Sequence, residues 1–217
     1  MVVSMRVSRV LVLILAILIA AHAPLRSEET HPPRRPERLL RLMKQMTLEE
    51  KISLLSGKDG GQTRSIERLG IPSLRVIDGP LGVGWGVRAV AFPCGLAMAA
   101  TWNPDLIYET GRALAAETRA AHRHVLLGPC INIVRTPLAG RTFESFSEDP
   151  FLTAAIATAY VHGLQSAGVG ACLKHFVCNN QEYQRTSISV DVDERTRREI
   201  YLKAFEGVIR NAAPWMV

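Results

Sequence analysis

The sequence predicts an α/β protein built on a parallel sheet, and three observations support this fold class. Strand-like apolar runs alternate along the chain with segments that carry the apolar spacing of helices. The strand-like runs are apolar throughout, which is typical of parallel strands covered on both faces. Polar side chains follow each run, as they do at the carboxyl ends of strands where α/β sites form. An open doubly wound sheet and a (β/α)8 barrel both fit these observations.

The expected helices are defined by their capping residues. Thr47 and Glu50 have the spacing of a capping box. Asn103-Pro104 and Asp149-Pro150 each place a cap before a proline at the first helical position, and Asp193 caps a further helix. The expected helices are 36–46, 48–55 with Gly57 as its stop, 104 to about 122, 150 to Gly168, and 193 to about 211.

The expected strands are 74–77, 125–133 and 170–177, with a fourth that begins at 215–217. Asp78 follows the first strand directly. Polar residues also follow the next two strands: Asn132 and Arg135 after the second, and Lys174, His175, Asn179, Asn180 and Glu182 after the third. Three strand ends that all carry polar groups predict one shared site.

The amino-terminal segment has the pattern of a signal peptide. Two arginines precede an apolar run from Val10 to Ala21, and the run ends in Ala21-His22-Ala23. The run is short for a membrane span, so we expect export to the periplasm or the extracellular space. Pro24 is a poor context for cleavage, and an uncleaved leader would anchor the protein in a membrane. We therefore expect a leader at 1–23, a proline-rich charged linker at 24–36 and a folded domain at 37–217.

Charge and cysteine usage exclude two classes of partner. Half of the formal net charge of +6 lies in the leader and linker, and the rest of the chain has no basic stripe with interleaved aromatics, so we expect no nucleic acid. Cys94, Cys130, Cys172 and Cys178 lie among small or apolar neighbours, which favours buried thiols, although an exported protein could form disulfides. No C-x-x-C or paired His/Cys spacing is present, so we expect no metal and no cofactor.

The stretch SLRVIDGPLGVGWG, residues 73–86, allows two interpretations. Its glycines could cradle a phosphate, but a dinucleotide fingerprint needs its last glycine to open a helix, and no helical cap follows Gly86. We therefore interpret the glycines as a flexible loop that carries Trp85. An Asp-Gly-Pro sequence is also a common turn, so Asp78 alone could be a turn residue.

Five ordered motifs resemble one family of enzymes. They are DGPLG (78–82), AFPCGLAMAATWNP (91–104), GPCINIVRTPLAGRTFESFSEDP (128–150), LKHFVCNNQEYQR (173–185) and VDERTRREIYLKAF (192–205). Together they resemble the N-terminal domain of family 3 glycoside hydrolases. Residues 177–180 read VCNN where the related N-acetylhexosaminidases have Pro-Gly-His-Gly, so the chain is similar to the glucosidase/xylosidase branch.

The resemblance implies a (β/α)8 barrel that hydrolyses O-glycosidic bonds at the non-reducing end of β-glucosides, with oligosaccharides or aryl β-glycosides as substrates. By motif, Asp78 would accept hydrogen bonds from sugar hydroxyls, and Arg141, Lys174, His175 and Arg185 would line the same subsite as donors. We expect Trp85 near the sugar entrance.

Retention needs two carboxyl groups, and in this family the nucleophile and the acid/base lie beyond the position that matches Val217. The resemblance thus implies that the chain forms about the first half of a barrel and lacks the catalytic residues, the C-terminal half of the barrel and the following domain. We expect the chain to be inactive alone. Glu144 is expected to pair with nearby arginines. The alternatives are a non-catalytic sugar-binding remnant and a nucleotide-binding α/β oxidoreductase.

Overall fold

The computed structural model describes residues 37–217, so the expected leader at 1–23 and the expected linker at 24–36 lie outside the described residues. The chain divides into two compact units, and the described part of the first is α2 (Glu37–Gln45), an exposed helix with a Glu37–Arg41 ion pair one turn apart. The second unit spans Met46–Val217. Its first helix is α3 (Leu48–Leu55), and the capping box of Thr47 and Glu50 is present as predicted.

The centre of the second unit is a three-stranded parallel sheet in the order β3-β4-β5. The strands are β3 (Val76–Asp78), β4 (Val125–Leu127) and β5 (Gly170–Ala171). Beyond β5, Cys172 forms a parallel bridge to Met216, so the segment at 215–217 begins a fourth position of the sheet, as expected. A separate antiparallel pair, β1 (Gly57–Asp59) and β2 (Gln62–Thr63), precedes the sheet and was not predicted.

The strands are shorter than the sequence predicts, because the ladder is interrupted after β4. Pro129 lacks the N–H that a continuous ladder needs at its position. Pairing then resumes as an isolated parallel bridge between Cys130 and Lys174. The apolar runs 125–133 and 170–177 therefore each contain a short strand followed by isolated bridges. The first run is largely buried, whereas the second is buried only in its first half.

The helices begin and end close to the predicted boundaries. Helix α5 (Pro104–Ala120) and helix α6 (Pro150–Ser166) start at their Asn and Asp caps, each of which accepts backbone hydrogen bonds from the first turn. The last helical segment runs through α7 (Glu194–Thr196), a π-helical turn at Arg197–Tyr201 and α8 (Leu202–Ala212). The short helix α4 (Gly95–Ala100) was not predicted, since no side chain caps it.

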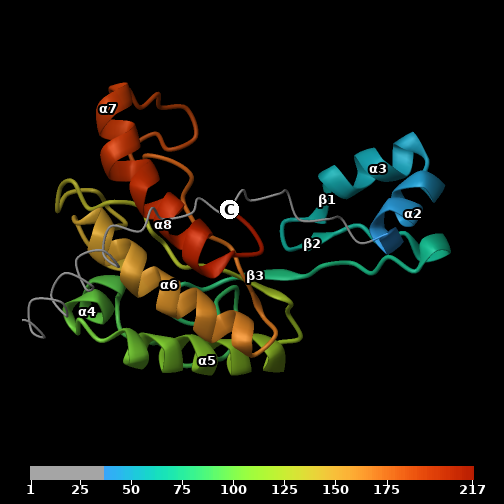
Figure 1. Ribbon diagram of the computed structural model, residues 1–217, viewed down its shortest axis with the longest axis horizontal. Coiled ribbons are helices and arrows are strands. Elements are labelled where there is room, and N and C mark those ends of the chain that lie inside the picture. The colour runs from blue at the N-terminus through green and yellow to red at the C-terminus, as the bar shows by residue number, and fades with distance from the viewer. Residues whose placement is uncertain (1–36) are drawn as a thin grey trace, which may run out of the picture. The chain divides into compact units, whose positions relative to one another are not determined.

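Helices α5, α6 and α8 lie side by side, with α6 in the middle (Figure 1). Two glycines allow α5 and α6 to approach closely. A Cβ at Gly163 would collide with the carbonyl oxygen of Tyr108, and one at Gly111 would lie 2.5 Å from the carbonyl oxygen of Tyr160. Because both obstacles are backbone atoms, neither position accepts a larger residue without moving a helix.

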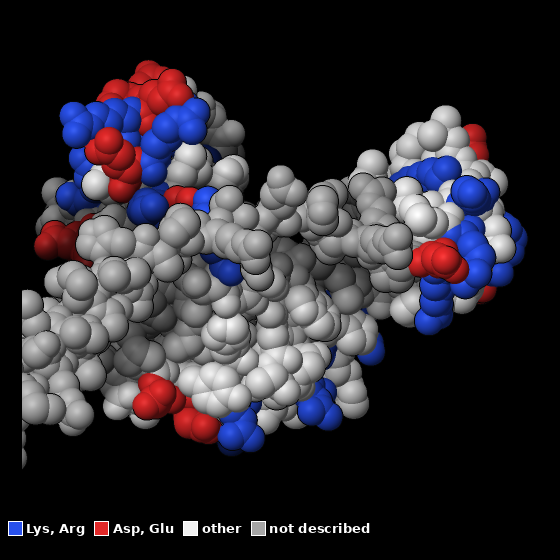
Figure 2. All heavy atoms as spheres, in the orientation of Figure 1, with Lys and Arg blue, Asp and Glu red and all other residues white. Residues whose placement is uncertain are grey.

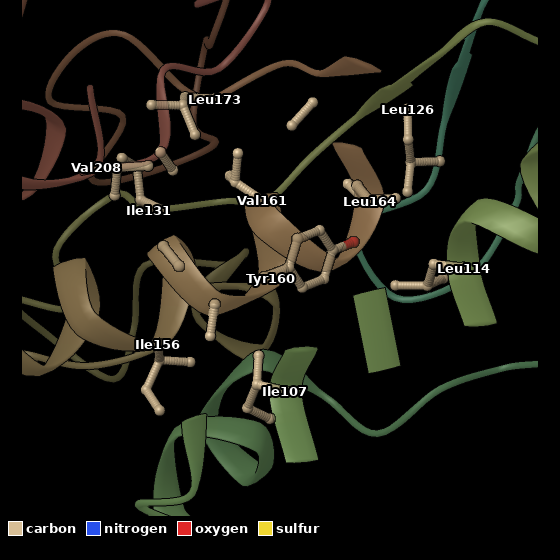
Figure 3. Packing of buried hydrophobic residues seen from close by; sticks show 14 of the residues in the cluster. Ile107, Leu114, Leu126, Ile131, Ile156, Tyr160, Val161, Leu164, Leu173 and Val208 are labelled. Carbon is tan, nitrogen blue, oxygen red and sulfur yellow. The ribbon is translucent and has the colours of Figure 1, made fainter. Parts of the chain in front are cut away.

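The main core lies between these helices and the sheet. Figure 3 shows Tyr160 and Leu164 of α6 among Leu114 of α5 and Leu126 of β4, with Val208 of α8 beside Ile131 and Leu173. These side chains are almost wholly shielded from solvent. The four cysteines are free thiols, and Cys130 and Cys178 are buried as expected, whereas Cys94 and Cys172 are only partly buried.

The surface charges around α7 and α8 are mixed in sign, as Figure 2 shows, and pair one turn apart. Within residues 37–217, no helix is long and apolar enough to cross a membrane.

Candidate active site

Asp78 is the last residue of β3, where its backbone pairs with Leu127 of β4. The corner that follows is fixed from two sides. The buried hydroxyl of Tyr160 donates to the carbonyl oxygen of Pro80 at 2.9 Å, and the Gly84 N–H donates to the carbonyl oxygen of Asp78 at 2.8 Å. The Asp78 carboxylate is thus held at the carboxyl end of the sheet on a rigid turn.

Lys174 reaches the same end of the sheet from the segment after β5. Its backbone N–H donates to Pro129 at 3.1 Å, and its carbonyl oxygen accepts from Ile131 at 2.7 Å. These bonds fix the position of Lys174 relative to β4, and its Nζ then lies 2.6 Å from Oδ1 of Asp78. The two residues are separated by 96 positions in the sequence and meet because their strands are parallel and in register.

Lys174 also belongs to a longer network of charges, which we call the site ion network. Its Nζ lies 3.8 Å from Oε2 of Glu144, whose other oxygen accepts a hydrogen bond from Nε of Arg141. Arg141 in turn faces Glu182 at 3.8 Å, and Arg185 contacts the second oxygen of Glu182 at 3.0 Å. In order, the network is Asp78, Lys174, Glu144, Arg141, Glu182 and Arg185, with alternating signs.

Burial differs strongly along the site ion network. The Glu144 side chain is 5% exposed and that of Lys174 13%, whereas Asp78 is 39% and Arg185 is 58% exposed. Although burial disfavours its charge, the hydrogen bond and negative charge of Glu144 raise the pKa of Arg141. The inner members are therefore structural charges, and Asp78 keeps a carboxylate that a ligand can reach. The predicted pairing of Glu144 with an arginine is confirmed.

His175 lies beside this network as a neutral ring. Burial is the main cause that lowers its pKa to about 4, and the positive charges of Arg141, Lys174 and Arg185 act in the same direction. At neutral pH the imidazole is therefore uncharged, with one donor and one acceptor nitrogen. Nδ1 lies 3.6 Å from Sγ of Cys130.

Trp85 occupies a different place from the other predicted residues. Its ring is 53% exposed and lines a hollow of about 420 Å³ together with residues 59–62 and Arg123. In the described part of the chain, no hydrogen bond or ring interaction joins Trp85 to the site ion network. The role of Trp85 at the sugar entrance stays a prediction.

The polar residues after β4 form a second cluster. Asn132 donates to Asn180 at 3.4 Å, and Asn180 donates to the hydroxyl of Tyr201 at 2.7 Å. Arg135 lies over the ring of Tyr201 and contacts its hydroxyl at 3.4 Å. This cluster connects the strand end to the π-helical turn that contains Tyr201.

The glycine stretch does not form a phosphate cradle. No helix begins directly after Gly86, because the next helix, α4, begins only at Gly95. Gly82 instead has φ +136°, and a Cβ there would collide with the carbonyl oxygen of Val90. The glycines therefore allow a tight loop against another segment, in agreement with the sequence interpretation.

Sequence reasoning missed the contributions of Cys130, Ser145 and Tyr160. All three are buried, and their polar contacts join distant segments, so no local pattern marks them. Glu182 was expected among the polar residues after the third strand, but its place between Arg141 and Arg185 was not. Among residues 37–217, no group of three or more His, Cys, Asp or Glu side chains could hold a metal ion.

The arrangement suits a polyhydroxylated ligand. Asp78 offers an accessible acceptor, Lys174 and Arg141 offer donors, and His175 offers a neutral ring at the same end of the sheet. Sugar hydroxyls both donate and accept, so they can satisfy such a mixture of groups.

Comparison with known proteins agrees with this chemistry. The family model described as glycosyl hydrolase family 3 N terminal domain matches residues 42–217. A thermostable β-glucosidase B from Acetivibrio thermocellus is 47% identical over 189 residues, which cover 82% of this chain and 25% of that protein. A β-glucosidase from Rhizobium radiobacter is 51% identical over 178 residues, covering 79% and 22%.

Solved structures show the same fold. A β-glucosidase from Kluyveromyces marxianus in complex with glucose superposes with a TM-score of 0.80 at 44% identity, over 82% of this chain and 22% of that one. β-Glucosidase 3B from Thermotoga neapolitana in complex with glucose gives a TM-score of 0.76 at 40% identity, over 82% and 28%. The chain thus spans about a quarter of the length of these relatives. The family model covers most of the chain, and the chain therefore belongs to glycosyl hydrolase family 3, in the region of its N-terminal domain.

Proposed function

We propose that this chain forms the part of a retaining β-glucosidase that binds the terminal, non-reducing sugar of a β-glucoside. The observation that carries the proposal is the Asp78–Lys174 pair at 2.6 Å, which joins the carboxyl ends of β3 and β5 and leaves Asp78 accessible. In barrel enzymes that end of the sheet holds the site. Relatives that are β-glucosidases, and two solved β-glucosidase structures in complex with glucose, support this choice of sugar.

The three parallel strands and their helices would be the first part of a (β/α)8 barrel. In this arrangement Asp78 accepts from sugar hydroxyls, Lys174 and Arg141 donate, and His175 faces the same ligand. Arg185 is the outermost cation of the network and would contact a bound sugar only from its rim.

The carboxylates of the site ion network are suited to binding rather than to nucleophilic attack. Asp78 and Glu144 each face a cation, so oxygens of both carboxylates are already engaged in ion pairs. Hydrolysis with retention requires a carboxylate nucleophile and an acid/base about 5–5.5 Å apart. We propose that both come from outside residues 37–217, so that this chain by itself binds sugar without turnover. We also propose export, which the leader pattern at 1–23 supports.

A chimera tests the proposed function. Residues 42–217 would replace the matched segment of the Acetivibrio β-glucosidase, and hydrolysis of p-nitrophenyl β-glucoside would be measured. We expect turnover, and a loss of about 10- to 100-fold in kcat/KM on Asp78→Asn, because a hydrogen bond to a charged group contributes about 1.5–3 kcal/mol. The matched control is Asp105→Asn, an exposed aspartate in the first turn of α5.

A folded chimera without turnover, or one in which both aspartate variants behave alike, would contradict the proposal. Calorimetry on the 217-residue chain with glucose completes the test. We expect saturable binding that Asp78→Asn weakens and no release of nitrophenol. Turnover by the chain alone that Asp78→Asn abolishes would instead make Asp78 catalytic.

A further inference from the structure

Cys130 lies at the base of the candidate site, although no part of the proposed function uses it. The residue is 1% exposed, and its sulfur has polar neighbours from three segments. Ser145 Oγ lies 3.5 Å away, His175 Nδ1 lies 3.6 Å away, and the backbone N–H of Asn132 points at the sulfur. Burial raises the pKa of this thiol, so at neutral pH it keeps its hydrogen.

The hydrogens of these groups can be assigned by counting donors and acceptors. His175 is neutral, so its Nδ1 is either an acceptor or a donor. If Nδ1 accepts the thiol hydrogen, the sulfur can accept from both Ser145 and Asn132, so the thiol, hydroxyl and amide hydrogens all have a partner. If Nδ1 donates to the sulfur, the thiol hydrogen either goes to Ser145 or, when Ser145 also donates to the sulfur, has no acceptor.

The second arrangement leaves one group unsatisfied. Ser145 is 4% exposed, and within residues 37–217 its hydroxyl hydrogen bonds to no atom other than the sulfur of Cys130. With the thiol hydrogen directed at Oγ, the buried serine hydroxyl would have no acceptor. Buried polar hydrogens without partners are rare and unfavourable, so the first arrangement is preferred.

We infer that Cys130 is a positioning residue that donates its thiol hydrogen to Nδ1 of His175 and thereby fixes the hydrogen of the imidazole on Nε2. Nε2 has no hydrogen-bond partner in the described part of the chain. The site then presents a third kind of donor next to Lys174 and Arg141, and Asp78 is left as the exposed acceptor. This inference deepens the proposed function and rests on it only for the identity of the ligand.

The polarity of the site follows from this tautomer. A ligand hydroxyl that faces His175 must accept from Nε2–H, so its own hydrogen is free to go to a carboxylate such as Asp78. A ligand that places an ammonium group there would bring an N–H donor against the Nε2–H donor, and no hydrogen bond could form. The structure thus favours neutral hydroxylated rings over amino-substituted ones at the position facing His175.

The tautomer can be measured in the ligand-free 217-residue chain. Long-range ¹⁵N–¹H correlation spectra distinguish imidazoles protonated on Nε2 from those protonated on Nδ1, and His175→Gln identifies the signal. We expect the Nε2–H pattern in the unaltered chain at pH 7. A predominant Nδ1–H pattern overturns the inference, whether or not the chain binds sugar.

Variants of Cys130 separate positioning from packing. Cys130→Ala removes the donor, and we expect a mixture of tautomers and a severalfold weaker binding of glucose. Cys130→Ser restores a donor of similar size and should restore the Nε2–H pattern. Cys178→Ala is the matched control, because Cys178 is also buried and its thiol forms no hydrogen bond with His175.

The pH profile provides a further readout, since His175 is also faced by the cations Arg141, Lys174 and Arg185 and by the Asp78 carboxylate. Loss of the Nδ1 contact in Cys130→Ala should shift the titration of His175, whereas Cys178→Ala should not. An unchanged tautomer and titration in a folded Cys130→Ala chain would contradict the inference. If that variant does not fold, the spectrum of the unaltered chain decides alone.

Discussion

Replacing Glu144 by Gln should destabilise the fold by an amount that can be bounded from the structure. The Glu144 carboxylate is 5% exposed and contacts both Arg141 and Lys174. Removing one partner of a buried ion pair costs about 3–5 kcal/mol, because the other charge stays buried without compensation. Here Glu182 and Asp78 still face the two cations, and glutamine keeps the volume and one acceptor. We therefore expect a loss of about 2–4 kcal/mol.

Urea unfolding of the 217-residue chain measures this loss. With a dependence of about 2 kcal/mol per molar urea, the middle of the usual range, the midpoint should fall by about 1–2 M. The matched control is Glu148→Gln, which makes the same change four positions along the chain at an exposed side chain. Substitutions of this kind at the surface change stability by about 0.5 kcal/mol or less. Equal midpoints for the two variants would refute the view that Glu144 holds the network together.

Three other substitutions test separate parts of the structure. The folded state holds the pKa of His175 at about 4, below the usual value of 6.5, so between these pH values the unfolded chain binds more protons and stability falls as pH falls. His175→Gln should flatten this dependence in urea titrations at pH 5 and 7.5, and His162→Gln, at an exposed position of α6, should leave it unchanged. Tyr160→Phe leaves the carbonyl oxygen of Pro80 without its donor, so the free energy of unfolding should fall by about 1–2 kcal/mol in the same assay and glucose binding should weaken. Unchanged stability and affinity would show that the corner after Asp78 does not depend on the hydroxyl. Gly163→Ala should lower the thermal midpoint by several degrees despite alanine's better helix propensity, since its Cβ would meet a main-chain carbonyl of α5, and a rise would contradict close packing.

Helix boundaries could be predicted from the sequence because capping is local. The side chain of Asn103 accepts from Leu106, and that of Asp149 accepts from Phe151 and Leu152, all within three residues. Such contacts depend on short stretches of chain and not on the rest of the fold. Strand lengths could not be predicted in the same way. Apolar runs mark burial, but pairing depends on the neighbouring strand, and Pro129 interrupts it.

The main residues of the candidate site could be predicted from the sequence, but the order of the charges along the site ion network could not. Strand ends and family motifs named Asp78, Arg141, Lys174, His175 and Arg185 in advance, and the structure brings these together. Glu182 as the link between the two arginines was not foreseen. Trp85 lines a hollow with Arg123 and residues 59–62, and its expected place near the sugar entrance stays a prediction.

The sequence by itself determined the α/β class, the boundaries of the capped helices, the family and most residues of the candidate site, because each depends on local patterns or ordered motifs. Only the tertiary structure decided which charge faces which. Asp78 and Lys174 meet across 96 residues through the register of parallel strands, and Cys130 meets His175 across 45. These contacts are set by sheet pairing and helix packing together, and no single stretch of sequence contains that information.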